Sequence, residues 1–248
     1  MKRKLAMAMI VFMATSAAAQ QTAGQSDLTG RAGDASTNIV WRADAAVQRT
    51  LQASRAQEAP AITAVSRVVN WWGGTGVIVF AAVLWLGGRV AGRDAVARIG
   101  LRGAEGIAIA SAISGIAKGL SGRARPFLTP GEPWHWDFNH GWSDARYFSM
   151  PSGHTTATVA FAVAAAVAAW QYRRAGGPVF GVVMILSGLG VAFARLYANQ
   201  HWLSDVVVAI ALGTATSMVL ARLHARGPAT GYHRVMLGAS GSAGPGIK

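Results

Sequence analysis

Five long apolar runs, separated by short segments that carry most of the charge, constrain the fold of this chain more than any other feature of its sequence. The run from Val68 to Gly88 has no charged residue and carries Trp71, Trp72 and Trp85 near its ends. Tryptophans in these positions are typical of a helix that crosses a bilayer, which needs about 20 apolar residues. Similar runs cover residues 99–120, 155–171, 175–194 and 202–221. The pattern predicts an all-α, polytopic membrane helix bundle with about five spans.

Composition agrees with a membrane protein and argues against a nucleic-acid-binding one. Hydrophobic residues make up 52% of the chain and charged residues only 13%, about half the charged share of a soluble domain. The net charge is +13, but the basic residues lie between the apolar runs, not in a recognition motif. The chain has no cysteine, which excludes disulfides, a thiolate nucleophile and Cys-ligated zinc.

The two ends of the chain differ from the apolar runs. Residues 1–19 have a basic start, a short apolar core and an Ala17-Ala18-Ala19 cleavage site, which predict a signal peptide; left uncleaved, it would be a sixth span. Residues 20–67 are expected to form a periplasmic segment that is loosely ordered or forms a weak amphipathic surface helix ending at Pro60. Residues 68–226 form the expected membrane domain, and 227–248 a flexible cytoplasmic tail.

Basic residues between the runs predict the topology. Arginines follow the first, third and fifth runs, and positive charge favours the cytoplasmic side. The connections 121–154 and 195–201 then face outward, as does the amino-terminal segment, in agreement with an export signal. The arginines on the predicted cytoplasmic side are Arg89, Arg93, Arg98, Arg102, Arg173, Arg174, Arg222 and Arg226.

The segment 193–205 joins the last two runs and holds reactive side chains. His201 and Asp205 are four residues apart, so on a helix they would share one face. A carboxylate bound to one ring nitrogen fixes the tautomer and leaves the other nitrogen free to attack. Arg195 can hold an anion beside that nitrogen. By itself, this pattern also fits an ordinary ion pair on a helix surface.

Two further segments are predicted to open on the same side of the membrane. Lys118 and Arg125 belong to the segment at the outer end of the second run, and together with Arg195 they can surround the oxygens of a phosphoryl group. Ser152 and Gly153 open the third run, where free backbone N–H groups and the helix dipole favour an anion. His154 follows them directly.

The order and spacing of these residues resemble the type 2 phosphatidic acid phosphatase and vanadium haloperoxidase superfamily, in its membrane-bound lipid phosphatase branch. Lys118 stands six residues before Arg125-Pro126, Pro151-Ser152-Gly153-His154 follows, and Arg195 stands five residues before His201. Asp205 completes the third motif, so the resemblance covers residues 118–205. One position departs from the family, which usually has serine where this chain has Ala194.

The resemblance implies a hydrolase of a lipid phosphate or diphosphate, active at the periplasmic face of the inner membrane, with no cofactor or metal. His201, held by Asp205, would form a phosphohistidine, and His154 would protonate the leaving oxygen. Neutral His201 and protonated His154 together predict a bell-shaped pH profile. The expected phosphate-binding residues are Lys118, Arg125, Ser152, Gly153 and Arg195.

Alternatives stand beside this interpretation. The same pocket filled with vanadate would make a haloperoxidase, and a protein without activity would bind or transport lipid. Arg123 matches no motif position and is expected to be an interfacial anchor. Glu105 either pairs with Arg102 or has a function within the membrane. His224 and His233 are expected to be solvated, and His135, Asp137 and His140 lack the spacing of a structural zinc site.

The connection from Phe127 to Met150 is long for a loop without structure, which argues for a function. Its aromatic residues suit the membrane interface, where they would guide a lipid headgroup toward His201. A compact cap pinned by aromatic contacts is the equal alternative. These residues are Trp134, Trp136, Phe138, Trp142, Tyr147 and Phe148.

Overall fold

The computed structural model describes residues 38–55, 60–171, 177–226 and Met236. These residues form helices and loops, with one isolated β-bridge between Arg123 and Trp136. The predicted signal peptide and most of the predicted tail lie outside the described residues. The longer helices are α3 (Ile39–Arg55), α4 (Pro60–Trp71), α5 (Val77–Val90), α6 (Asp94–Ser121), α7 (Gly153–Gln171), α8 (Gly177–Tyr197) and α9 (Leu203–Arg226).

Five stretches of these helices are long and apolar enough to cross a membrane, which confirms the predicted count. They are Ala64–Val90, Asp94–Ser121, Gly153–Gln171, Gly177–Tyr197 and Leu203–Ala225. The first stretch runs through α4, a π-helical turn η1 (Trp72–Gly76) and α5. Pro60 begins α4 and does not end the preceding helix, because proline fits the first turn, where its missing N–H would have no partner.

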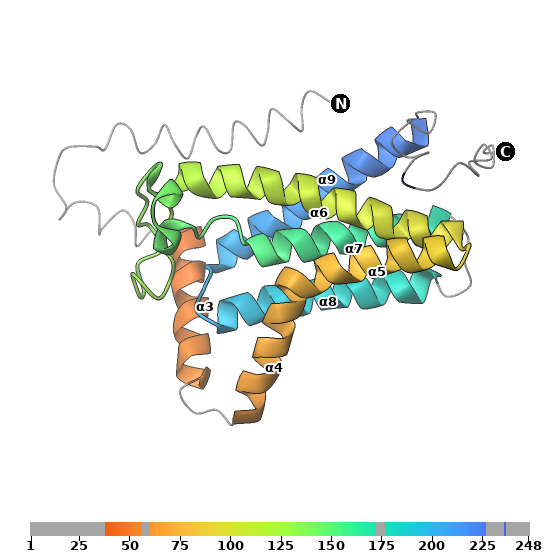
Figure 1. The fold of residues 1–248 in the computed structure, drawn as a ribbon. Coiled ribbons are helices and arrows are strands. Elements are labelled where there is room, and N and C mark those ends of the chain that lie inside the picture. Colours follow the sequence, from red (N-terminus) through yellow and green to blue (C-terminus); the bar gives the residue numbers. More distant parts are fainter. Residues whose placement is uncertain (1–37, 56–59, 172–176, 227–235, 237–248) are drawn as a thin grey trace. The chain divides into compact units, whose positions relative to one another are not determined.

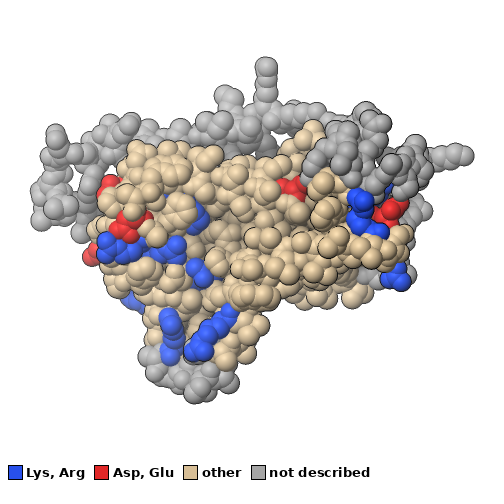
Figure 2. Space-filling model, viewed as in Figure 1, with Lys and Arg blue, Asp and Glu red and all other residues tan. Residues whose placement is uncertain are grey.

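Helix α7 lies at the centre of the bundle and packs against α6, α8 and α9 (Figure 1). Its buried positions are mostly alanine. Small side chains let neighbouring helices approach closely, and close packing stabilises helix association in lipid, where the hydrophobic effect between helices is absent. The space-filling view shows lysines and arginines gathered toward the ends of the bundle, with a broad band of few charges between them (Figure 2). This distribution fits helices that cross a bilayer.

Helices α5 and α6 pack closely at two glycines. A Cβ added to Gly100 of α6 would lie 2.3 Å from the backbone nitrogen of Trp85 and 2.6 Å from the carbonyl oxygen of Ala81, both in α5. A Cβ on Gly88 of α5 would lie 2.4 Å from the backbone nitrogen of Ala97. These contacts involve backbone atoms, which have no rotamer to change. The α5–α6 pair therefore depends on the absence of side chains at both positions.

We expect Gly100→Ala to separate α5 from α6 and to lower stability by about 1–3 kcal/mol, the usual cost of overpacking. The measurement is the melting temperature of the detergent-purified protein, followed by tryptophan fluorescence. Gly115→Ala is the matched control on the same helix, because a Cβ there meets nothing within 4 Å. Equal melting temperatures for the two variants would contradict the close packing.

Candidate active site

The three segments singled out by sequence meet at one end of the bundle. This end holds the last turn of α6, the first turn of α7, the connection from α8 to α9 and the loop 122–152 (Figure 1). The backbone N–H of Ser152 donates to the carbonyl oxygen of Asp205 over 3.1 Å, so the second and third motifs are in direct contact. A Cβ on Gly153 would lie 3.4 Å from Cε of Lys118, which brings the first motif beside the second.

Lys118 is held in the last turn of α6. Gly122 ends this helix in the left-handed conformation at φ 55°, and its N–H donates to the carbonyl oxygen of Lys118 over 3.2 Å. The Lys118 side chain is 5% exposed. Its Nζ donates to the carbonyl oxygens of Phe148 and Ser149, over 2.8 and 3.2 Å. Because an ammonium has three donors, one remains for a further acceptor.

The two motif arginines approach from different elements, and hydrogen bonds orient both guanidiniums. Arg125 donates to the backbone oxygen of Ala145 over 3.0 Å and to Oε1 of Gln200. Arg195, in the last turn of α8, donates from Nη1 to Oδ1 of Asn70 in α4 over 3.0 Å. The buried Nε of Arg195 has no hydrogen-bond partner among the described residues. A buried N–H without a partner is costly, and an anion would supply the acceptor.

Ser152 and His154 stand at the start of α7. Ser152 is fully buried and its Oγ lies 3.0 Å from Oγ1 of Thr155. Lys118, Arg125 and Arg195 all lie within Coulombic range of the His154 ring. A Cβ on Gly74 would lie 3.0 Å from Nε2 of His154. The glycine-rich π-helical turn η1 therefore makes room for this imidazole, in keeping with the frequent placement of π-bulges at functional sites.

His201 lies in the connection before α9, not on the helix, so the expectation that it shares a helical face with Asp205 is wrong. The two side chains still meet, with His201 Nδ1 3.6 Å from Oδ2 of Asp205. Asp205, in the first turn of α9, reaches back to accept from the backbone N–H of Trp202 over 2.9 Å, as the third residue does in a capping box. Its Oδ2 also accepts from Oγ of Ser149 over 2.6 Å.

The electrostatic surroundings of His201 favour the neutral imidazole. The residue is 3% exposed. Burial lowers the pKa of His201 to about 3, the positive charges of Lys118 and Arg195 act in the same direction, and Asp205 opposes them. With Nδ1 directed toward Asp205, the lone pair on Nε2 is available at neutral pH.

Arg123 is the residue that sequence analysis missed. It was expected to be an interfacial anchor, but it is 1% exposed and its guanidinium joins two buried carboxylates. Nη1 lies 2.6 Å from Oδ1 of Asp205, and Nη2 lies 2.7 Å from Oδ2 of Asp44. The rings of Trp136 and Trp202 lie 4.9 and 5.6 Å from its Cζ. Its position two residues before Arg125, inside the first motif, was the available signal.

The long loop 127–150 is held by contacts of its aromatic residues, although it has few regular elements: the 3-10 turns η2 (His140–Trp142) and η3 (Ala145–Tyr147). Trp136 packs on Arg123 and stacks with Phe138, while Trp134 contacts the ring of Trp41 in α3. These contacts are the ones expected of a compact cap that aromatic side chains hold in place. Trp142 is 60% exposed, which leaves an aromatic surface for an interfacial role.

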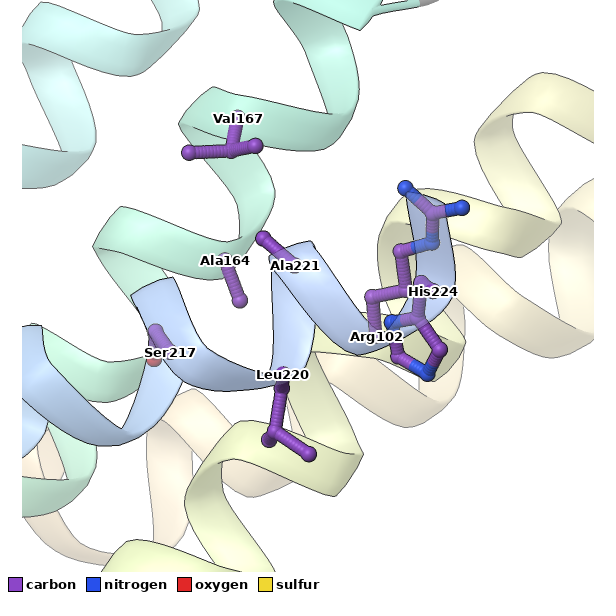
Figure 3. A pocket seen from close by; sticks show the side chains of 7 residues that line it. All are labelled: Arg102, Ala164, Val167, Ser217, Leu220, Ala221 and His224. Carbon is purple, nitrogen blue, oxygen red and sulfur yellow. The ribbon is translucent and has the colours of Figure 1, made fainter. Parts of the chain in front are cut away.

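Three further histidines each pair with a carboxylate. His224 was expected to be solvated, but its Nε2 lies 3.0 Å from Oε2 of Glu105 and both side chains are largely buried. His224 stands near the carboxyl-terminal end of α9, away from the cluster, and lines a small pocket (Figure 3). In the loop, His135 and His140 pair locally with Glu132 and Asp137. The pocket is lined by Arg102, Ala164, Val167, Ser217, Leu220, Ala221 and His224.

Comparison with known families agrees with the geometry of the site. The family model described as the PAP2 superfamily matches residues 101–228, which are 128 of the 248 residues and include all three motifs. The chain belongs to the PAP2 superfamily. No curated protein matches it closely enough to count as a relative.

The fold of this PAP2 protein is similar to that of a solved membrane protein, a transmembrane PAP2-type phosphatidylglycerolphosphate phosphatase from Bacillus subtilis. The TM-score is 0.57 at 18% sequence identity, over 78% of this chain and 90% of that one. At this identity the likeness concerns the fold alone. This PAP2 protein therefore has the helical architecture of a multi-pass membrane phosphatase.

The low pKa of His201 predicts how stability depends on pH. Because the folded protein resists protonation of this imidazole, the unfolded chain takes up the proton first as pH falls below about 6.5. Wild-type stability should then fall relative to His201→Gln, by at most about 1.4 kcal/mol per pH unit. Above about pH 7 the difference should be constant.

The measurement compares melting temperatures of wild type and His201→Gln between pH 4 and 8. His135→Gln replaces a histidine whose side chain is 47% exposed, and this control should follow the wild-type slope. Parallel curves for wild type and His201→Gln would show that His201 is not held neutral.

Proposed function

We propose that this PAP2 protein hydrolyses a lipid phosphate or lipid diphosphate through a phosphohistidine on His201. The observation that carries the proposal is the buried, neutral His201 beside Asp205, within Coulombic range of the cations Lys118 and Arg195. A neutral imidazole is a nucleophile, and nearby cations stabilise the charge on a phosphoryl group during transfer.

In the first step, Nε2 of His201 donates its lone pair to phosphorus, and the bond from phosphorus to the lipid oxygen breaks. His154 gives a proton to that oxygen, so the lipid leaves as an alcohol, or as a monophosphate if the substrate is a diphosphate. The phosphorylated imidazole carries positive charge, which the carboxylate of Asp205 stabilises at 3.6 Å.

In the second step, His154, now neutral, takes a proton from water as the water oxygen attacks phosphorus. The P–N bond breaks and its electrons return to His201, which restores both histidines and releases inorganic phosphate. His154 therefore acts as a general acid in the first step and as a general base in the second.

Positioning and electrostatic stabilisation supply most of the rate in phosphoryl transfer. We assign that role to three side-chain cations and to the start of α7, since the N-terminus of a helix favours an anion. Side chains of this kind perform the charge neutralisation that metal ions provide in other phosphatases. The assigned residues are Lys118, Arg125, Arg195, Ser152 and Gly153.

The position of the cluster supports a lipid substrate and a periplasmic active site. Lys118 and Asp205 stand at the ends of membrane-spanning stretches, so the site opens at the boundary of the bilayer. Arg89, in the last turn of α5, and Arg93, directly before α6, stand at the opposite end of the bundle. The positive-inside rule favours the cytoplasm for that end, which supports our proposal that the site lies at the outer face of the inner membrane.

Phosphate release from a panel of lipid phosphates and diphosphates tests this function. We expect His201→Ala to lower release by at least about a thousandfold, as removal of a nucleophile does. Wild type quenched during turnover of ³²P-labelled substrate should carry one acid-labile, base-stable phosphate on His201. His224→Gln is the matched control at the other end of the bundle, where the amide can still donate to Glu105. Turnover by wild type without labelling, or by His201→Ala at the wild-type rate, would refute the phosphohistidine.

The proton donor is tested by changing the leaving group. We expect His154→Asn to lower kcat for an alkyl phosphate by about 10²–10⁴-fold, the usual contribution of general acid–base catalysis. With p-nitrophenyl phosphate the loss in formation of the phosphoenzyme should be much smaller, because nitrophenolate leaves without a proton. The pH profile on the alkyl substrate should be bell-shaped in wild type and lose its basic limb in His154→Asn. Equal losses on both substrates would remove His154 from the role of acid.

A further inference from the structure

Helix α3 turns a polar face toward the rest of the protein. Its buried residues are Asp44 and Gln48, one turn apart, while Val40 is 49% exposed. Asp44 is 1% exposed. A buried carboxylate is strongly unfavourable unless charged and polar partners compensate it, so the contacts of Asp44 determine why this helix is docked here.

Asp44 binds the start of α9. Its Oδ1 accepts from the backbone N–H of Ser204 and its Oδ2 accepts from the Ser204 hydroxyl, both over 2.7 Å. Ser204 is the second residue of α9, where backbone N–H groups have no partner within the helix. Asp44 therefore caps α9 from another helix, and its negative charge lies at the positive end of the α9 dipole.

Asp44 also shares the Arg123 guanidinium with Asp205. Nη2 donates to Asp44 over 2.7 Å, while Nη1 donates to Asp205 over 2.6 Å and to Ser204 Oγ over 2.7 Å. Nε and Nη2 also donate to the carbonyl oxygen of Pro133. The guanidinium is planar and its donors have fixed directions. Its attachment to Asp44 thus fixes the side on which it meets Asp205.

The charges in this chain of contacts alternate. Arg123 lies between two carboxylates, so Asp44 offsets part of its positive field and leaves more of the Asp205 charge to act on His201. Nδ1 of His201 is 3.6 Å from Asp205 and has no hydrogen-bond partner among the described residues. Its position and charge stabilisation therefore depend on how Asp205 is held.

Two more side chains of α3 reach the connection that carries His201. Nε2 of Gln48 donates to Oδ1 of Asn199, and Nε2 of Gln52 donates to the carbonyl oxygen of Tyr197, both over 3.3 Å. Figure 1 shows α3 crossing the end of the bundle beside the connection from α8 to α9. These two bonds join neutral groups and touch neither Arg123 nor Asp205, so they provide a comparison for the charged contact.

We propose that Asp44 is a positioning residue for catalysis, which acts on His201 through Arg123 and Asp205. This inference rests on the proposed phosphohistidine mechanism. When Nε2 attacks phosphorus, the imidazole becomes positive, and the carboxylate of Asp205 stabilises that charge. Without the negative charge of Asp44, the full positive charge of Arg123 acts on Asp205. The carboxylate of Asp205 then stabilises the positive charge on the attacking imidazole less.

The test is Asp44→Asn, which keeps the size of the side chain and removes its charge. We expect kcat and the single-turnover rate of phosphoenzyme formation to fall by tenfold or more. KM should stay within twofold, because the phosphate-binding cations are unchanged. Gln48→Ala and Gln52→Ala, which loosen α3 without changing the charges, should stay within threefold of wild type. Asp44→Asn combined with Asp205→Asn should lose less than the product of the single losses, because both act through one group.

Other outcomes would overturn the inference. One is a wild-type rate for Asp44→Asn, and another is a loss for Gln48→Ala as large as that for Asp44→Asn. A third is a loss of rate in Asp44→Asn that is fully explained by a smaller fraction of enzyme molecules that can be phosphorylated. If Asp44→Asn does not fold, Arg123→Lys serves, since an ammonium cannot bridge both carboxylates in the same way; wild-type kcat there would also overturn it. Absence of a phosphoenzyme in wild type would refute the proposed mechanism itself, whereas labelled wild type with an unaffected Asp44→Asn refutes the positioning role alone.

Discussion

The ion triad of Asp44, Arg123 and Asp205 is the interaction on which the reactive end of this protein depends. One fully buried guanidinium holds a carboxylate of α3 on one side and a carboxylate of α9 on the other, at 2.7 and 2.6 Å. Removal of one partner of such a group leaves a buried charge without compensation, which commonly costs about 3–5 kcal/mol. The triad fixes α3, the start of α9 and the loop 122–152 against one another, and so fixes the place of His201.

The membrane explains why so much polar structure is concentrated at one end. Along the bilayer the backbone is satisfied within helices, and small residues on α7 allow its neighbours to pack closely. Polar side chains are energetically costly within the bilayer, so the polar side chains of the site stand at helix ends. Lys118 comes from the last turn of α6, Arg195 from the last turn of α8 and Asp205 from the first turn of α9. Helix ends also provide unpaired N–H groups for anions.

Several details of the site arise from local backbone geometry. Gly122 lets α6 stop one turn after Lys118, since its φ of 55° is unfavourable for other residues. The π-helical turn in the first span brings Gly74 against the ring of His154, so the helix gives space to the proposed proton donor. His201 stands outside α9, where its ring meets the carboxylate of Asp205. In each case one side chain of the site is placed by a local change in a helix: α6 ends, the first span widens into a π-helical turn, or α9 begins only after the residue.

The sequence alone determined the helical class, the number of spans and the motif residues gathered at one end, because length, apolarity and motif spacing are properties of the chain itself. It did not reveal the docking of α3, since this segment was expected to be loosely ordered or to form a weak amphipathic surface helix, whereas the helix buries the polar Asp44 and Gln48. Nor did it reveal the role of Arg123, or the pairing of His224 with Glu105. Those contacts join residues 79, 82 and 119 positions apart. Only the tertiary structure decides these contacts, because the partner of a buried charge depends on which distant residues folding brings together. Such long-range pairs produce no periodic pattern in the sequence.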